Sequence, residues 1–210
     1  MSKRKQTANE ELANAASHGL GIIFCLSAMP FVLIDTFEKG DLKAFFSMIA
    51  FGLGMLLVYS FSTFYHYATN ERTKSLLQIG DHISIYFLIA GSYTPMMIKY
   101  LSPDMAFIFL SVIWTVVFLG TIFKIFFTKR FKFMSVLLYL VMGWMIVFVI
   151  KPLTQTLPLA IFLWILAGGL SYTIGVYFYV KSNKLYYHTI WHIFVLLGTV
   201  FHFIAIYKSI

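Results

Sequence analysis

Long apolar segments with short polar connections between them are the feature that most constrains the fold of this chain. A helix needs about 20 apolar residues to cross the hydrocarbon core of a bilayer. Of the 210 residues 60% are hydrophobic and only 11% are charged, and the mean hydropathy is +0.83, a composition foreign to soluble domains. We therefore predict an all-α integral membrane protein, a bundle of seven transmembrane helices at residues 17–37, 42–66, 81–100, 105–127, 132–150, 158–180 and 188–207.

The connections between these segments are too short to hold a linker or a second folded domain. We predict a short cytoplasmic N-terminal segment, residues 1–16, followed by a single seven-helix membrane domain, residues 17–210. The basic start MSKRK is compatible with a signal peptide, but the apolar run after it is too long and lacks a small-x-small cleavage site. Cys25 is the single cysteine, which excludes an intrachain disulfide.

The distribution of lysine and arginine predicts the orientation in the membrane. Eleven of the sixteen basic residues fall on the side of the N-terminus. We therefore predict a multi-pass plasma-membrane protein whose N-terminus lies in the cytoplasm and whose C-terminus lies on the extracytoplasmic side. The net charge of +8 does not indicate nucleic acid, because the basic residues flank apolar segments and form no basic helix face; they suit anionic lipid head groups. The eleven are Lys3, Arg4, Lys5, Arg72, Lys74, Lys124, Lys129, Arg130, Lys132, Lys181 and Lys184.

Two histidines in the run YYHTIWH open the seventh span. His188 and His192 are four residues apart, so a helix stacks them on one face, roughly 6 Å apart along its axis. With seven spans, His66 at the end of the second and Asp81 at the start of the third come to the same depth near the cytoplasmic surface. Ser62 lies one turn deeper than His66 on the same helix face.

These five residues match the chemistry of a metal site. Three neutral imidazoles and one solvent position form a catalytic zinc shell, so we predict His66, His188 and His192 as the ligands of Zn²⁺. A carboxylate inside a span costs a few kcal/mol unless it is paired or near water, and a cation offsets that cost. Asp81 would act as the general base, and Ser62 would hydrogen-bond to Asp81 or to the water.

Each of these residues also has a simpler reading. The histidines can be interfacial side chains with their tips in water, Asp81 can cap the third helix, and Ser62 can bond back to its own helix. His18 shares the same depth and is a further possible ligand. His202 is about 15 Å beyond His192 along the helix and cannot join the cluster.

Four motifs in register resemble the hemolysin III family, the microbial branch of the progestin-and-adipoQ receptor (PAQR) family, within a wider superfamily of membrane hydrolases. They are EELANAASHGLG in the first span, the Ser62–His66 spacing, GDHISIYFLIAGSYTP around Asp81, and HTIWH near the end. The resemblance covers nearly the whole chain. It implies a seven-helix bundle with a cytoplasmic N-terminus.

The resemblance also implies a function for the histidines. In the animal receptors of the family a zinc ion is held by three histidines that match His66, His188 and His192, and the residues that match Asp81 and Ser62 sit beside the zinc-bound water. A ceramidase-like hydrolysis of a lipid amide is associated with those receptors, whereas this chain lacks their long N-terminal region.

We therefore expect a zinc-dependent hydrolase of lipid amides or esters that acts at the inner leaflet and takes part in membrane lipid homeostasis. A non-enzymatic sensor or regulator of the membrane state, with a structural zinc, is the alternative. A pore-forming hemolysin is the least favoured hypothesis, because the spans are almost uniformly apolar and show no polar face to line a channel. Membrane lipid is the expected partner in all of these.

Overall fold

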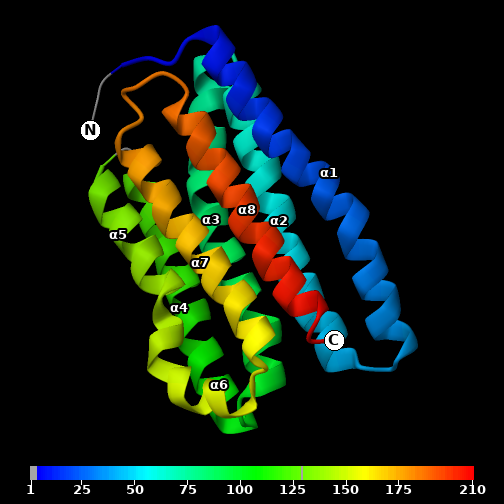
Figure 1. Ribbon diagram of the computed structural model, residues 1–210. Coiled ribbons are helices and arrows are strands. Elements are labelled where there is room, and N and C mark those ends of the chain that lie inside the picture. The colour runs from blue at the N-terminus through cyan, green and yellow to red at the C-terminus, as the bar shows by residue number, and fades with distance from the viewer. Residues whose placement is uncertain (1–3, 129) are drawn as a thin grey trace.

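The computed structural model describes residues 4–128 and 130–210, and within these ranges it contains helices and no strand. Lys3 and Lys129, two of the basic residues used to predict the orientation, lie outside the described residues. The helices stand side by side as one bundle (Figure 1). In chain order they are α1 (Ala8–Glu38), α2 (Leu42–Tyr67), α3 (Glu71–Tyr100), α4 (Pro103–Phe127), α5 (Lys132–Gly143), the 3₁₀ segment η1 (Met145–Val149), α6 (Ile150–Thr156), α7 (Leu159–Val180) and α8 (Tyr187–Tyr207).

These elements form seven segments that run the length of the bundle, since α5, η1 and α6 follow one another as a single fifth segment. Six of the seven are long and apolar enough to span a membrane. The remaining one, α3, has 30 residues and a lower hydropathy, because it carries polar residues such as Ser84 and Thr94 that are buried inside the bundle. The predicted all-α seven-helix membrane fold is confirmed.

The outer faces of the bundle are apolar. Large side chains such as Phe31, Phe107 and Phe148 are exposed on them, Phe148 to 83%. Aqueous solvent does not tolerate a continuous apolar surface of this kind, whereas the hydrocarbon of a bilayer covers it at no cost.

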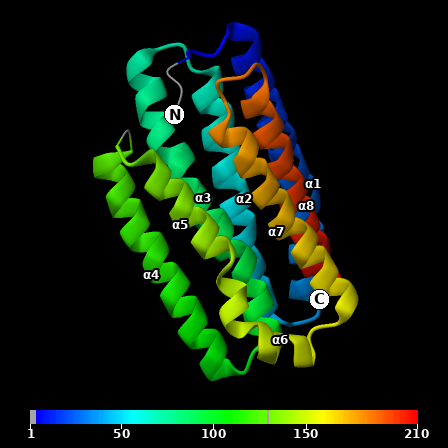
Figure 2. The same cartoon turned by 60° about the vertical axis from the view of Figure 1, so that its left-hand side comes forward.

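α3 and α8 each pack against helices on several sides. α2 lies along α3, α7 lies along α8, and α1 packs against both α2 and α8 (Figures 1 and 2). α5 packs sparsely on α3 and α7. The end with the N-terminus also carries the α2–α3 and α7–α8 connections, and the C-terminus lies at the opposite end (Figure 1).

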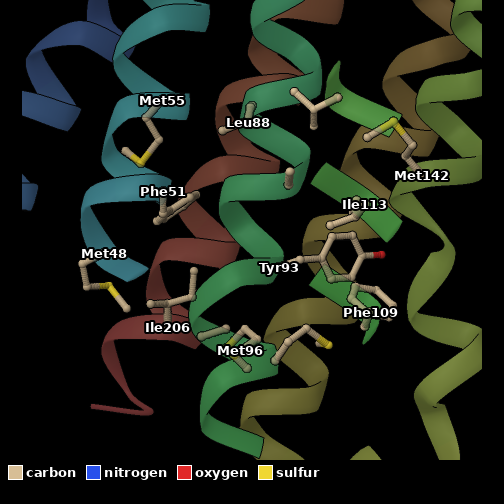
Figure 3. Close-up of a cluster of buried hydrophobic side chains, with 14 of the residues drawn as sticks. Met48, Phe51, Met55, Leu88, Tyr93, Met96, Phe109, Ile113, Met142 and Ile206 are labelled. Atoms are coloured by element: carbon tan, nitrogen blue, oxygen red, sulfur yellow. The ribbon is translucent and has the colours of Figure 1, made fainter. Parts of the chain in front are cut away.

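Glycines let α2 and α3 approach closely. A Cβ at Gly54 would lie 2.7 Å from the carbonyl oxygen of Phe87, and one at Gly91 would lie 2.7 Å from that of Ala50. Small residues at a helix contact allow this backbone approach inside membranes. Buried side chains from α2, α3, α4, α5 and α8 fill the adjoining core, among them Phe51, Leu88, Phe109, Met142 and Ile206 (Figure 3).

Two helices begin earlier than their apolar segments. α1 begins at Ala8, where Thr7 and Glu10 form a capping box, instead of at residue 17. α3 begins at Glu71, where the Asn70 side chain accepts a hydrogen bond from the backbone N–H of Thr73, instead of at residue 81. Asp81 is therefore nearly three turns inside α3, and its reading as a helix cap is wrong.

The fifth span is interrupted, where a single helix over 132–150 was predicted. α5 ends at Gly143, and the chain continues as 3₁₀ helix before α6. The Tyr93 hydroxyl donates to the Gly143 carbonyl (2.6 Å) and accepts from the Ile146 backbone N–H (3.1 Å). Backbone groups at membrane depth need such partners, so Tyr93 of α3 is what makes the interruption tolerable.

Candidate metal centre

Three histidines from two helices meet at the end of the bundle that carries the N-terminus. His66 comes from the last turn of α2, and His188 and His192 come from the first two turns of α8. One ring nitrogen from each lies within 4.8 Å of those of the other two. Ring centroids are 5.1 Å apart for His66 and His188, 5.0 Å for His66 and His192, and 4.6 Å for His188 and His192.

This spacing is close to that of a zinc shell. Two imidazole nitrogens bound to one tetrahedral zinc lie about 3.3 Å apart, so the nitrogens need to approach by at most about 1.5 Å, which side-chain rotation can supply. His66 is 5% exposed and His192 2%, so these two ligands are shielded from bulk water, whereas His188 is partly exposed. The three residues fit a metal ion of the kind that prefers imidazole.

Hydrogen bonds fix which nitrogen of two of these rings is available. His66 Nδ1 lies 2.6 Å from Glu11 Oε2, and His192 Nδ1 lies 3.1 Å from the backbone oxygen of Asn14. Because a carboxylate and a carbonyl only accept, both Nδ1 atoms carry the proton and both Nε2 atoms keep a lone pair. His66 Nε2 is buried and has no hydrogen-bond partner among the described residues, as expected for an atom that faces a metal ion.

The start of α1 supplies these supporting contacts. Glu11 also accepts from Lys74 Nζ through its other oxygen, at 2.8 Å. Asn14 is fully buried, and its side-chain oxygen accepts from the Thr189 hydroxyl (2.6 Å) while its amide nitrogen donates to Gln6 (2.6 Å). α1 therefore connects the ends of α2, α3 and α8 around the histidines.

Glu11 and Asn14 were not predicted as supports of the site. Both were assigned to the N-terminal segment that precedes the first span, because the apolar run begins only after them. The signal that could have found them is their spacing in EELANAASH: Glu11, Asn14 and His18 recur every three or four residues, which places them on one helix face.

The other predicted residues line one cavity with the histidines. Asp81, Ser62 and His18 all contribute to its wall. Ser62 is 1% exposed, and its hydroxyl has no hydrogen-bond partner among the described residues, so the bond back to its own helix is not formed. The Asp81 carboxylate lies 3.3 Å from His82 Nδ1, which also approaches the Gln78 carbonyl at 2.8 Å.

His82 follows Asp81 on α3 and lies about 100° from it around the helix. Its ring nevertheless bends back toward the N-terminus of α3 and contacts the Asp81 carboxylate. The general-base role of Asp81 and the hydrogen-bonding role of Ser62 stay predictions.

A comparison with known proteins places the chain in a family. A family profile described as "Haemolysin-III related" matches residues 6–203. The chain belongs to this haemolysin III-related family. It is 40% identical over 200 residues to a protein of Bacillus subtilis (strain 168) named "Hemolysin-3 homolog", covering 95% of this chain and 94% of the relative. It is 38% identical over 206 residues to "Hemolysin-3" of Bacillus cereus, covering 98% and 94%.

The chain is also similar to a human protein. "Monocyte to macrophage differentiation factor" of Homo sapiens is 29% identical over 215 residues, covering 97% of this chain and 86% of the relative. The resemblance to the hemolysin III family that the four motifs indicated is confirmed. The multi-pass membrane location is also confirmed, by the apolar helices together with the bacterial relatives.

The cavity of this haemolysin III-related protein changes character along its length. It has a volume of about 950 Å³, at the upper end of the range for small-molecule sites. The histidines and Asp81 occupy its polar end, and residues such as Leu88, Ile146, Val195 and Ile206 line its interior. A molecule with a polar head and a long apolar chain matches this gradient.

His18 and His202 line the same cavity as the cluster, as His82 does, without entering the ligand group. The ring of His18 stacks on that of His192, with centroids 3.6 Å apart and planes 17° from parallel. His202 reaches the cavity wall ten residues further along α8, where its Nε2 donates to the Ile165 carbonyl at 3.2 Å. The expectation that His202 lies apart from the cluster is confirmed.

Proposed function

We propose that this protein is a zinc-dependent hydrolase of membrane lipid amides or esters, acting at the inner leaflet and contributing to lipid homeostasis. The observation that carries the proposal is a largely buried three-histidine cluster with an unpartnered His66 Nε2, which lines a mainly apolar cavity together with Asp81. Hydrolysis needs a polarised carbonyl, a base and a place for the acyl chain, and this cavity offers residues for each.

His66, His188 and His192 would hold the zinc ion. A zinc ion with an open position supplies Lewis acidity, which polarises a carbonyl and lowers the pKa of water toward neutrality. Glu11 and the Asn14 carbonyl hold the proton on the outer nitrogens of His66 and His192, which keeps the inner nitrogens available as ligands.

Asp81 is the proton carrier in this proposal. Its carboxylate takes a proton from water as the water oxygen bonds to the acyl carbon, and returns a proton to the leaving nitrogen or oxygen as that bond breaks. The products are a fatty acid and an amine or alcohol. The contact with His82 holds the carboxylate in position, and the unpartnered Ser62 hydroxyl can hydrogen-bond to the reacting carbonyl or to Asp81.

The test compares metal content with turnover. Asp81→Asn should keep zinc at the wild-type level and lose turnover of ceramides and other lipid amides in proteoliposomes by about 10²–10⁴-fold, the usual contribution of a general base. Asp35→Asn is the matched control, because Asp35 pairs with Lys39 at the far end of α1. Full activity in Asp81→Asn would refute the role of Asp81, and a zinc-loaded wild type that cleaves no lipid amide or ester would refute the hydrolase.

A second candidate function is a non-enzymatic sensor or regulator of the membrane state with a structural zinc. The favouring observation is that the cluster joins α2 to α8, while Glu11, Asn14 and Lys74 add α1 and α3 through hydrogen bonds. In that case zinc removal would lower the unfolding temperature in detergent, and no lipid would be cleaved. Pore formation is not favoured, because the outer faces carry large apolar side chains.

A further inference from the structure

His18 is a buried side chain that the proposed mechanism does not use. It is 3% exposed, it projects from α1 into the wall of the cavity, and it lies against His192. Neither of its ring nitrogens has a hydrogen-bond partner among residues 4–128 and 130–210. The other near neighbour, Tyr59, meets the ring edge-on with centroids 5.2 Å apart.

The lack of partners on both nitrogens is unusual. A neutral imidazole has one N–H donor and one acceptor, and leaving either unpaired in a buried site costs about 1–3 kcal/mol in general. The ring contacts with His192 and Tyr59 fill the space around the side chain, but they give neither ring nitrogen a hydrogen bond. Buried polar groups without protein partners commonly mark a place for a ligand or a water molecule.

Ser62 adds a second polar group of the same kind. Its hydroxyl is buried without a partner, and Ser62 lies on α2 one turn from Tyr59, the residue that His18 touches. Two side chains from α1 and α2 thus present unmet donors and acceptors beside the three-histidine cluster, within the same cavity.

We propose that His18 recognises a hydroxyl group next to the reacting carbonyl of the lipid, and so selects hydroxyl-bearing lipid amides or esters over plain alkyl ones. A hydroxyl both donates and accepts, which matches the two unmet functions of a neutral imidazole. Since the His18 ring stacks on a candidate metal ligand, a group bonded to it lies close to the position of the carbonyl. This inference rests on the proposed function, since it names the substrate class for the same site.

The experiment uses two lipid amides that differ by one hydroxyl, N-(2-hydroxyethyl)palmitamide and N-ethylpalmitamide. Binding to the zinc-loaded, full-length Asp81→Asn protein in nanodiscs is measured, so that no amide is consumed. With His18 present, the hydroxyl-bearing amide should bind about tenfold more tightly, the preference that one buried hydrogen bond provides. When His18→Phe is added to the Asp81→Asn protein, a ring remains for stacking, but the ratio of the two affinities should fall to about one.

Two further variants make the result specific to His18. His18→Leu removes the same nitrogens with a different shape and should also lose the preference, so the test does not depend on the folding of one variant. His202→Phe alters another cavity-lining histidine outside the cluster, ten residues beyond His192 along α8, and should keep the preference.

An unchanged ratio of the two affinities in His18→Phe and His18→Leu would overturn the proposal. This includes the case in which both amides lose affinity equally, which is the result expected of a residue that only packs on His192. Failure of both amides to bind would overturn it as well. The proposed hydrolase fails by a different observation, namely no turnover of either amide by the zinc-loaded wild type.

Discussion

Glu11 offers the sharpest test of how the metal centre is built. Its carboxylate accepts from His66 Nδ1 at 2.6 Å and from Lys74 Nζ at 2.8 Å, and it is a quarter exposed. Replacing it by glutamine keeps an acceptor of the same size but removes the negative charge that faces the His66 N–H. The same substitution leaves the Lys74 ammonium without its anionic partner.

The expected magnitude follows from the position of Glu11 behind the ligand. Partners of metal-bound histidines contribute about 10–100-fold to metal affinity, which is about 1.4–2.7 kcal/mol. Because solvent reaches Glu11 and glutamine can still accept, we expect Glu11→Gln to weaken zinc binding about tenfold. Glu11→Ala, which leaves the His66 N–H without an acceptor, should approach the hundredfold end.

Competition with a chromophoric chelator measures these affinities on the detergent-purified protein. Glu71→Gln is the control, since Glu71 also lines the cavity mouth but is exposed on the first turn of α3. A zinc affinity that is unchanged in Glu11→Gln, or that falls equally in Glu71→Gln, would refute the reasoning.

Two further predictions concern the packing that positions the site, and thermal unfolding in detergent checks both. Gly54→Ala should destabilise by about 1–3 kcal/mol or more, because the new Cβ would lie 2.7–3.0 Å from backbone atoms of Phe87 and Leu88; Gly19→Ala, where the Cβ meets nothing within 4 Å, should be neutral. Tyr93→Phe should cost about 1–3 kcal/mol by leaving the Gly143 carbonyl and the Ile146 N–H unpaired. Equal stabilities within either comparison would contradict the packing described here.

The parts of the fold that the sequence predicted are those fixed by the bilayer. A span must be long and apolar, so six of the seven segments stand out by hydropathy alone, and α3 follows as the long helix between two of them. The alternation of their direction follows from that order. That alternation brought His66, His188 and Asp81 to one end of the bundle, and the spacing of His188 and His192 placed both on one face of α8.

The parts that the sequence did not predict depend on partners distant along the chain. Nothing in the apolar run around Gly143 indicates that the helix stops there, because the group that satisfies the broken backbone is Tyr93, fifty residues earlier. α3 extends beyond its apolar part because Asn70 caps it in a polar stretch, where hydropathy carries no signal. The support of His66 by Glu11 required knowing that α1 packs on α2.

The central claim is that His66, His188 and His192 bind one zinc ion. The most direct measurement is the metal content of detergent-purified protein by elemental mass spectrometry, with the wild type beside His188→Ala/His192→Ala. We predict close to one zinc per wild-type chain and none in the double variant. A wild type purified without chelators that contains no metal, or a double variant that retains it, would contradict the account.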